Sequence, residues 1–329
     1  MLLRCFPRIH IGLMDMGNAT PRRYGGAGFT LSAPAIEIFA SSTSKRTTFS
    51  GLDQIDADGK AQLLAALEEW SKSNDQNVSI RIRTVPTQHV GLGTKTSLLL
   101  GSLTAATLVS GLKINRLEIQ KMSRRGGASG VGINSFFRGG FIADGGHPAN
   151  YDAGFSPSSQ QTPEDVPHVI SRVEIPKGWE FHLLLAPGKR FSGNSEQEFF
   201  TKNTPIPRQE VLESIALLYH GVVPAVATTD LDLLKRSLIE MHRLGFKRRE
   251  IDGQSENVRD VVNSFVSIQD CAVGLSSMGP VVYAISNRSI RDEIRRLSKK
   301  CKFTLLATCK GRNKGFEVES YAESPARRS

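Results

Sequence analysis

The chain has 329 residues, of which 39% are hydrophobic and 22% charged, and its formal net charge at pH 7 is +10. This length exceeds that of one typical compact core, so two domains are expected, and the composition is that of an ordinary soluble globular protein. No apolar run is long enough to cross a membrane, no secretory leader is recognisable, and the four cysteines lack metal-ligand spacing, so a cytoplasmic location is expected.

The positive charge narrows the class of partner. The basic residues are dispersed along the chain, and the sparse aromatic residues are not interleaved with them, which argues against a stacking platform for single-stranded nucleic acid. A phosphorylated small molecule accounts for the charge more simply than DNA does. Neither nucleic acid nor a membrane is therefore expected as a partner.

Two strands and an intervening loop are predicted at the N-terminus. Residues 4–14 alternate polar and apolar side chains and end at Asp15, and a second strand-like run covers 29–40. The segment between them is rich in glycine and proline, which is typical of a loop. The region offers a candidate cluster for binding a phosphorylated substrate, formed by Arg8, His10, Asp15, Arg22 and Arg23. For each residue alone, a surface charge is the alternative, and for His10 a hydrogen-bonded strand histidine.

The stretch 86–100, P-T-Q-H-V-G-L-G-T-K-T-S-L-L-L, connects a predicted strand at 81–85 to a long apolar helix at 96–112. A helix over 60–73 is expected to pack on the sheet. Glycines let backbone approach a ligand closely, and a helix start presents unpaired N–H groups and the positive end of its dipole to an anion. The residues expected to bind phosphate are Gly91, Gly93, Thr94, Lys95 and Thr96. The alternative is an ordinary glycine turn with a threonine N-cap.

A second glycine-rich stretch, 124–147, follows a short helix predicted at 113–124. Its glycines imply tight turns on both sides of a short helix, with backbone close to a ligand. Asp144 and His147 end the stretch. Because two residues do not make a metal site, structural or substrate-orienting roles are expected for them.

The rest of the chain alternates strands and helices, which is typical of a small α+β sandwich. Residues 148–167 lack periodicity and are interpreted as a mobile loop or lid near the domain boundary. A glycine- and serine-rich turn that begins at residue 272 leads into an apolar strand at 281–285, and the tail from 317 to 329 is expected to be frayed. The other predicted elements are strands at 171–176, 181–187 and 302–309 and helices at 208–221, 230–244, 255–268 and 288–300.

Three of these stretches together resemble the GHMP kinase superfamily. They are P-R-I-H-I-G-L (7–13), P-T-Q-H-V-G-L-G-T-K-T (86–96) and G-L-S-S-M-G-P (274–280), which are similar to its first motif, its phosphate-binding loop and its third motif. The resemblance implies an α+β fold of two domains. One, over 1–165, would carry the phosphate-binding loop and be similar to the second domain of ribosomal protein S5. The other, over 166–329, would be ferredoxin-like.

One departure from the kinases concerns the phosphate acceptor. In the kinases, a segment like S-G-V-D-N-x-x-S-x-x-G-G carries the aspartate that activates the acceptor. The matching run here, S-G-V-G-I-N-S-F-F-R-G-G (129–140), has Gly132 in that place. Because a glycine neither accepts a proton nor holds Mg²⁺, kinase chemistry of the usual kind is not expected. An ATP-dependent small-molecule kinase with another base stays as the alternative.

The motifs are more similar to those of the β-ribofuranosylaminobenzene 5′-phosphate synthase family, a non-kinase branch of the same superfamily. The similar runs are R-I-H-I-G-L-M-D-M (8–16), R-R-Y-G-G-A-G (22–28), H-V-G-L-G-T-K-T (89–96), G-G-F-I-A-D-G-G-H (139–147), G-F-K-R-R-E-I (245–251) and S-S-M-G-P-V-V-Y (276–283). Two positions depart from the family pattern. Tyr24 replaces the usual acid, and Lys95 makes the phosphate loop more cationic.

This resemblance implies a glycosyltransferase, a decarboxylating phosphoribosyltransferase of tetrahydromethanopterin biosynthesis. It would condense 5-phospho-α-D-ribose 1-diphosphate with 4-aminobenzoate, or 4-hydroxybenzoate, and release CO₂ and diphosphate. Mg²⁺ is the implied cofactor, with unknown protein ligands, and no organic cofactor is expected. The resemblance also implies a homodimer.

Residue roles follow from the same resemblance. Asp15, Arg22 and His10 are the catalytic candidates. Arg22, Arg8 and Lys95 are expected to neutralise phosphate charge, Asp15 to hold ribose hydroxyls or metal or steady the oxocarbenium, and His10 or His147 to orient the aromatic carboxylate. The wall of the substrate site is expected to include Ser276, Ser277 and Gly279. A phosphometabolite- or nucleic-acid-binding protein without catalysis is the remaining alternative.

Overall fold

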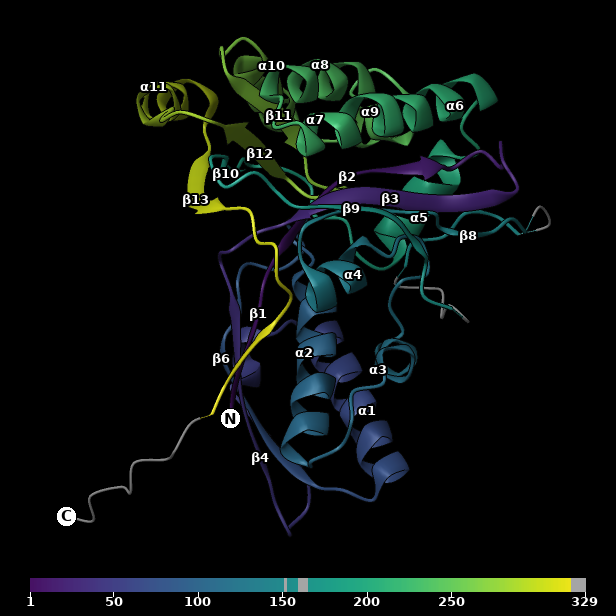
Figure 1. The fold of residues 1–329 in the computed structure, drawn as a ribbon, viewed down its shortest axis with the longest axis vertical. Helices are drawn as coiled ribbons and strands as arrows, with labels where there is room; N and C mark the ends of the chain where they lie inside the picture. The colour runs from purple at the N-terminus through teal and green to yellow at the C-terminus, as the bar shows by residue number, and fades with distance from the viewer. Residues whose placement is uncertain (151–152, 159–164, 321–329) are drawn as a thin grey trace.

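A first β-sheet and three helices form the lower half of the molecule in Figure 1, which shows the computed structural model; its described residues are 1–150, 153–158 and 165–320. The strand order is β14-β1-β4-β6-β5. Helix α2 packs on β1 and β4, and α1 and α3 pack on α2. The elements are β1 (Leu2–Cys5), β4 (Ile36–Ser42), β5 (Thr48–Ser50), α1 (Ala57–Asn74), β6 (Val78–Thr84), α2 (Thr94–Val109), α3 (Arg116–Ser123) and β14 (Glu317–Glu319).

A second sheet crosses the middle of the molecule in the order β2-β3-β7-β9, with β8 pairing β3. Helix α4 lies on its lower face, and α6 and α9 pack on β2 from above (Figure 1). This sheet therefore has helices on both faces. Its elements are β2 (Arg8–Asp15), β3 (Arg22–Thr30), α4 (Val131–Arg138), β7 (Phe141–Asp144), β8 (His147–Pro148), β9 (Val169–Val173), α6 (Arg208–Leu217) and α9 (Gly245–Asp252).

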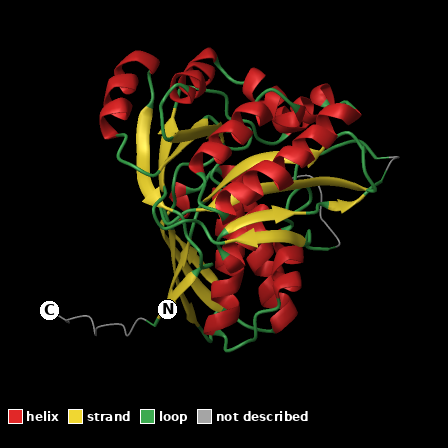
Figure 2. Cartoon of the chain, turned by 45° about the horizontal axis from the view of Figure 1, so that its top comes forward, coloured by secondary structure: helices red, strands yellow, loops and turns green. Residues whose placement is uncertain are grey.

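A third, four-stranded antiparallel sheet has the order β11-β12-β10-β13. Helices α8 and α10 pack on β11, and α11 packs on α10. Figure 2 shows the strands in the middle of the molecule lying between helices above and helices below. The elements are β10 (Glu180–Leu185), α5 (Asn194–Asn203), a π-helical turn (Leu218–Val222), α7 (Val223–Ala227), α8 (Leu231–Met241), α10 (Glu256–Val266), β11 (Cys271–Leu275), β12 (Val281–Ser286), α11 (Arg291–Cys301) and β13 (Thr304–Lys310).

The hydrophobic core runs continuously from the second sheet to the third. One cluster of buried side chains joins Ile9 and Phe29 of the second sheet to Phe181 and Tyr283 of the third. Val90 of the phosphate loop belongs to this cluster, so apolar packing holds the loop against the second and third sheets. Strand β9 pairs with β7, and β14 returns to β1, so segments beyond residue 166 complete sheets of the N-terminal half. The domain boundary at 165/166 stays a prediction.

The predicted N-terminal strands differ from the observed ones. The run 4–14 is divided into β1 and β2, and the run 29–40 into β3 and β4, at Pro7 and Pro34, which lack the N–H of a ladder. Arg22 and Arg23 lie on β3, although a loop was expected there. The glycines that suggested a loop serve close strand packing instead, since a Cβ at Gly28 would collide with the Ile9 carbonyl oxygen.

Three further segments differ from expectation. Residues 272–275 belong to a strand rather than a turn, and residues 317–319 of the tail form β14. The residues from 321 lie outside the described part of the chain, as does part of 148–167. The pattern missed α9, because its buried face carries Lys247 and Glu250 together with apolar residues. The predicted helices at 60–73, 96–112, 113–124, 255–268 and 288–300 are confirmed with shifted ends.

One helical run, Arg208–Ala227, is long and apolar enough to cross a membrane by length and composition alone. The expectation that no run reaches that length is therefore wrong by this criterion. Val211, Leu218 and Val222 of the run are buried within the hydrophobic core, as the core helix of a globular domain requires.

Candidate functional site

The connection from β6 to α2 forms the phosphate loop of the candidate site. Gly91 and Gly93 have φ values of 99° and 72°, a region that favours glycine. A Cβ at Gly91 would also collide with the Ser276 carbonyl oxygen. Gly93 is the N-cap of α2, and no described side chain caps that helix start. The first N–H groups of α2 therefore have no side-chain cap, and their binding of an anion stays a prediction.

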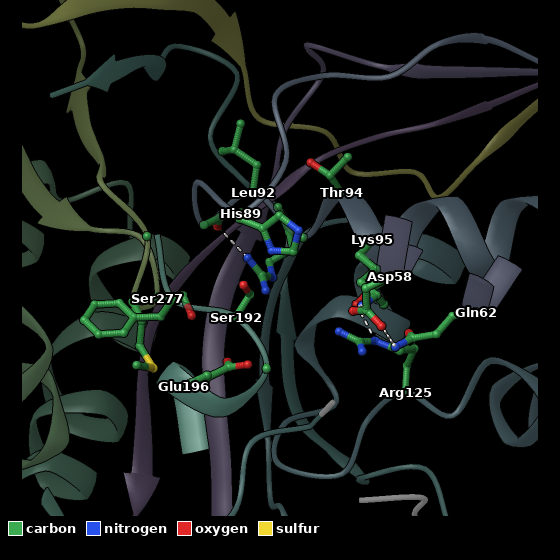
Figure 3. A pocket seen from close by; sticks show the side chains of 18 residues that line it. Asp58, Gln62, His89, Leu92, Thr94, Lys95, Arg125, Ser192, Glu196 and Ser277 are labelled. Atoms are coloured by element: carbon green, nitrogen blue, oxygen red, sulfur yellow. Dashed lines mark hydrogen bonds and ion pairs between the residues drawn. The ribbon is translucent and has the colours of Figure 1, made fainter. Parts of the chain in front are cut away.

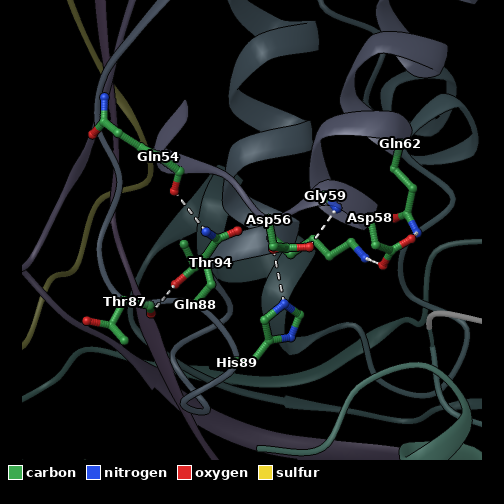
Figure 4. A network of polar contacts seen from close by, with 10 residues as sticks. Gln54, Asp56, Asp58, Gly59, Gln62, Thr87, Gln88, His89 and Thr94 are labelled. Atoms are coloured by element: carbon green, nitrogen blue, oxygen red, sulfur yellow. Dashed lines mark hydrogen bonds and ion pairs between the residues drawn. The ribbon is translucent and has the colours of Figure 1, made fainter. Parts of the chain in front are cut away.

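Polar contacts fix this loop to its surroundings (Figure 4). The His89 ring contacts the Asp56 carboxylate at 3.1 Å, and Asp56 also accepts the Gly59 N–H at the start of α1. The Thr94 hydroxyl donates to the Thr87 carbonyl, and the Gln88 amide donates to the carbonyl of Gln54. The loop therefore meets α1 through side chains as well as through the core.

Two segments remote in sequence meet the loop at Gly91. The Arg8 Nη1 and the Ser276 hydroxyl each donate to the Gly91 carbonyl at 2.6 Å. A Cβ at Gly279 would collide with the backbone of Val90. The structure thus brings together the predicted binding residues of the N-terminal strand, the phosphate loop and the 276–279 turn.

A cleft of about 270 Å³, here called the outer cleft, opens beside this junction (Figure 3). Three cationic side chains, Arg8, Lys95 and Arg125, line it with the acids Asp58 and Glu196. In Figure 3, Lys95, Asp58 and Arg125 lie on one side and Glu196 and Ser277 on the other. The other lining residues are Gln62, His89, Gly91, Leu92, Gly93, Thr94, Thr96, Phe191, Ser192, Gly193, Met278 and Gly279.

The cations of the cleft retain donors for a ligand. Lys95 is paired with Asp58, whose side chain is 64% exposed, and the Arg125 Nε donates to the Thr96 hydroxyl at 3.1 Å. Burial lowers the pKa of Arg8 to about 10, with a further contribution from Arg125. Burial likewise lowers the pKa of Arg125. Because Arg8 still titrates above neutral pH, it is charged there and favours an anion in the cleft.

A second cavity of about 120 Å³, here called the inner chamber, continues from the outer cleft. Arg8, Thr96 and Arg125 line both cavities and so mark the junction between them. The inner chamber alone is lined by His10, Leu13, Gly126, Ala128, Ser129, Gly132, Ile133, Ser158, Phe200 and Glu250. Gly132, which stands where kinases have their aspartate, is thus part of the wall. A Cβ there would lie 3.3 Å from the Thr96 methyl group.

His10 is the predicted catalytic residue that reaches the inner chamber. Its Nε2 lies 3.2 Å from the Ser129 hydroxyl, which donates to Asp144 at 2.9 Å. Because the Ser129 proton is used on Asp144, the His10 Nε2–H donates to Ser129. Burial, with Arg8 and Lys247 nearby, lowers the pKa of His10, so the ring is neutral at pH 7. Burial raises the pKa of Asp144 to about 6.

Asp15 and Arg22, the other catalytic candidates, line neither cavity. The Asp15 carboxylate accepts the N–H groups of Gly17, Ala19 and Thr20, and it is 3% exposed. Arg22 donates from Nε to the Gly145 carbonyl and from Nη2 to the carbonyl of Gly146. The structure therefore does not bring these two side chains to the cleft, and their catalytic roles stay predictions. His147 likewise contacts a carbonyl, that of Gly126, at 2.8 Å.

Sequence reasoning missed several lining residues, among them Arg125, Asp58 and Glu196. It also missed a buried ion pair, since Lys247 Nζ lies 2.5 Å from a Glu250 oxygen and the side chains are 4% and 2% exposed. Burial raises the pKa of Glu250 and lowers the pKa of Lys247, and the attraction between the two charges opposes both shifts. The spacing of an acid three residues after a lysine in a helix was the available signal.

The protein side chains of the cleft are too few to hold Mg²⁺ by themselves. They fit an ion that is also bound by the phosphates of the substrate. Within the residues that the structure describes, no group of three or more His, Cys, Asp or Glu side chains converges. Mg²⁺ is commonly held by one or two carboxylates together with substrate phosphates and water. Asp58 and Glu196, both in the wall of the outer cleft, are the carboxylates that suit this arrangement.

No protein-family model matches the chain. It is similar along most of its length to archaeal proteins named beta-ribofuranosylphenol 5'-phosphate synthase. The protein from Archaeoglobus fulgidus is 32% identical, with 96% of this chain and 99% of the relative covered. Those from Methanocaldococcus jannaschii and Methanothermobacter thermautotrophicus are 31% and 28% identical, covering 88% and 85% of this chain and 90% and 87% of the relatives.

Solved structures of kinases share the fold. A homoserine kinase from Cytophaga hutchinsonii superposes with a TM-score of 0.68 at 14% identity, covering 97% of each chain. A phosphomevalonate kinase from Streptococcus pneumoniae superposes with a TM-score of 0.69 at 11% identity, covering 94% of this chain and 98% of the kinase. At such identities the likeness concerns the fold alone. It confirms the α+β GHMP-kinase fold expected from the motifs.

Proposed function

The chain belongs to the family of the beta-ribofuranosylphenol 5'-phosphate synthases, and we propose that it joins phosphoribosyl diphosphate to an aromatic acid with loss of CO₂ and diphosphate. The printed name of the relatives ends in a phenol, so 4-hydroxybenzoate is the first acceptor to test and 4-aminobenzoate the second. The product would be a C-glycoside that serves tetrahydromethanopterin biosynthesis in the cytoplasm.

The observation that carries this proposal is a phosphate loop beside a wall in which Gly132 stands where the resemblance to the kinases places an aspartate. The loop and the cations Arg8, Lys95 and Arg125 surround a cleft suited to a diphosphate. Gly132, next to Thr96 of that loop, supplies no carboxylate to activate a phosphate acceptor. A site that binds diphosphate but has no base at this position suits departure of diphosphate better than transfer of a phosphoryl group.

The residues of the outer cleft would assist bond breaking at the anomeric carbon. As the carbon–oxygen bond to diphosphate breaks, its electron pair leaves with the diphosphate. The N–H groups of α2 and the cations Lys95, Arg8 and Arg125 would stabilise that charge. Mg²⁺ bound to the diphosphate, with Asp58 or Glu196, would supply further charge neutralisation.

The decisive experiment follows label from the carboxyl carbon of the acceptor. The protein is incubated with phosphoribosyl diphosphate, Mg²⁺ and carboxyl-labelled 4-hydroxybenzoate or 4-aminobenzoate. We expect labelled CO₂ and diphosphate to be released in equal amounts, and only when phosphoribosyl diphosphate is present. Absence of labelled CO₂ with both acids would overturn the proposal. Parallel reactions with ATP in place of phosphoribosyl diphosphate are expected to show no turnover.

A further inference from the structure

The Lys247–Glu250 ion pair is buried, and the fold does not by itself require charged side chains at these two positions. Taking two charges out of water is costly, and such a pair is often replaceable by apolar residues without loss of stability. The Lys247 ammonium contacts Glu250 and donates to the Leu275 carbonyl at 2.9 Å. Glu250 Oε2 faces the Lys247 ammonium at 2.5 Å, and no other donor among the described residues bonds the carboxylate. A carboxylate with unused acceptor capacity thus lies in the wall of a cavity.

Glu250 lies at one end of the inner chamber, so a ligand there would have a defined orientation. Glu250 lines the inner chamber and not the outer cleft, whereas Arg8, Arg125 and the acid Glu196 line both. Two cations and one acid therefore stand at the mouth of the inner chamber, and the Glu250 carboxylate stands away from the mouth. Arg8 keeps a buried Nε without a hydrogen-bond partner among the described residues.

Apolar side chains form part of the wall between these charged ends, namely Leu13, Ala128, Ile133, Phe200 and Met278. The rest of that wall is polar and includes His10, Ser129 and Ser158. The chamber volume of about 120 Å³ lies well below the roughly 300 Å³ at which sites for drug-sized ligands begin. A ligand that matches has one flat apolar ring, an anionic group at one end and a hydrogen-bond donor at the other.

We propose that the inner chamber holds the aromatic acid, with its carboxylate at Arg8 and Arg125 and its para hydroxyl or amine donating to Glu250. This proposal rests on the proposed function and adds a catalytic residue to it. Lys247 positions the Glu250 carboxylate. In this orientation the ring carbon that bears the carboxylate faces the outer cleft, where the anomeric carbon would lie.

The chemistry balances with these groups alone. A ring electron pair forms the new carbon–carbon bond as diphosphate departs with the pair of the broken bond. The positive charge reaches the para heteroatom, whose proton is shared with Glu250. The bond to the carboxylate then breaks, its electron pair restores the aromatic ring, CO₂ leaves, and the proton returns to the heteroatom.

The first test uses the unaltered full-length protein and does not require turnover. Binding of 4-hydroxybenzoate and of 4-fluorobenzoate, which is similar in size but has no donor, is measured by calorimetry with Mg²⁺ and inorganic diphosphate. We expect 4-hydroxybenzoate to bind about 10-fold more tightly. Equal affinities would overturn the proposal. Because this measurement involves no reaction, its result is separate from the labelled-CO₂ result that tests the proposed function.

The second test substitutes the carboxylate. Glu250→Gln is expected to lower kcat about 100-fold and to reduce the preference for 4-hydroxybenzoate over 4-fluorobenzoate, while affinity for phosphoribosyl diphosphate stays within about twofold. Asp252→Asn, on the exposed side of the same helix, is the matched control and should behave as the unaltered protein. Unchanged kcat and preference in Glu250→Gln would overturn the proposal even if the synthase reaction is established.

A third variant separates this role from a purely structural one. Glu250→Gln leaves Lys247 buried without its counter-ion, so it is compared with the double variant Lys247→Met/Glu250→Gln, which removes both charges. We expect the double variant to recover thermal stability but not kcat. Recovery of both would show that the pair acts only on folding.

Discussion

Two regions of this molecule carry similar charged motifs and use them differently. In the segment from Asp15 to Tyr24, the carboxylate of Asp15 accepts three backbone N–H groups, and Arg22 and Arg23 donate to backbone carbonyls. Around the phosphate loop, by contrast, Arg8 keeps an unpartnered Nε and Lys95 meets one largely exposed acid. Charged groups that are saturated by backbone hold loops in place, whereas groups with unused donors beside a cavity are available for a ligand.

The largest effect expected from this contrast concerns Asp15. Asp15→Ala leaves three backbone N–H groups without their acceptor, so we expect a loss of about 3 kcal/mol in the free energy of unfolding. Denaturant unfolding at pH 7 measures it. Activity per folded molecule should change far less than stability. A variant that unfolds like the unaltered protein yet loses turnover would show that Asp15 acts on substrate, and the contrast between the two regions would fail.

The same contrast explains what the sequence could and could not predict. The phosphate loop was predictable because glycines before a long apolar helix indicate a turn and a helix start from local sequence alone. The placement of Asp15 and Arg22 was not predictable. A charged residue in a motif gives the same sequence pattern whether its side chain binds a ligand or the protein backbone. Glu250 was missed because its burial depends on how α9 packs on β2, a contact between segments more than 200 residues apart.

The second prediction concerns the cation that the loop itself carries. Lys95→Ala should weaken binding of phosphoribosyl diphosphate about 30-fold, or about 2 kcal/mol, because a charge-assisted contact to a diphosphate oxygen is lost. Affinity for the aromatic acid should change little. Lys60→Ala, on the exposed face of α1, is the control. Equal losses for both substrates would mean that the loop does not hold the diphosphate, and raising the salt concentration should reduce the difference.

A smaller effect is expected at Gly132, which lies in the wall of the inner chamber beside Thr96, a residue that lines both cavities. A methyl group there would lie 3.3 Å from the Thr96 methyl, so the loop must yield by a few tenths of an ångström. Gly132→Ala should therefore lower kcat/KM about fivefold, near 1 kcal/mol, with little change in stability. Gly178→Ala, where a Cβ meets nothing within 4 Å, is the matched control. Activity unchanged in Gly132→Ala would mean that Thr96 does not need its present position.

The smallest effect is expected at Asp56. Its carboxylate contacts both a backbone N–H, that of Gly59, and a side chain of the phosphate loop, the His89 ring. Burial acts to raise its pKa, but the Gly59 N–H and the His89 ring outweigh burial, so the pKa is lowered. A lowered carboxylate pKa stabilises the fold above the unfolded value of about 3.9, and this contribution is lost as pH falls through the folded value. Asparagine still caps α1, so Asp56→Asn should cost less than about 1 kcal/mol at pH 7. The stability difference from the unaltered protein, measured by denaturant unfolding, should stay nearly constant from pH 7 down to about 4 and shrink as pH falls further. A difference that stayed constant below about pH 4 as well would mean that the Asp56 charge does not stabilise the loop, which would then depend on Gly91 and its buried neighbours alone.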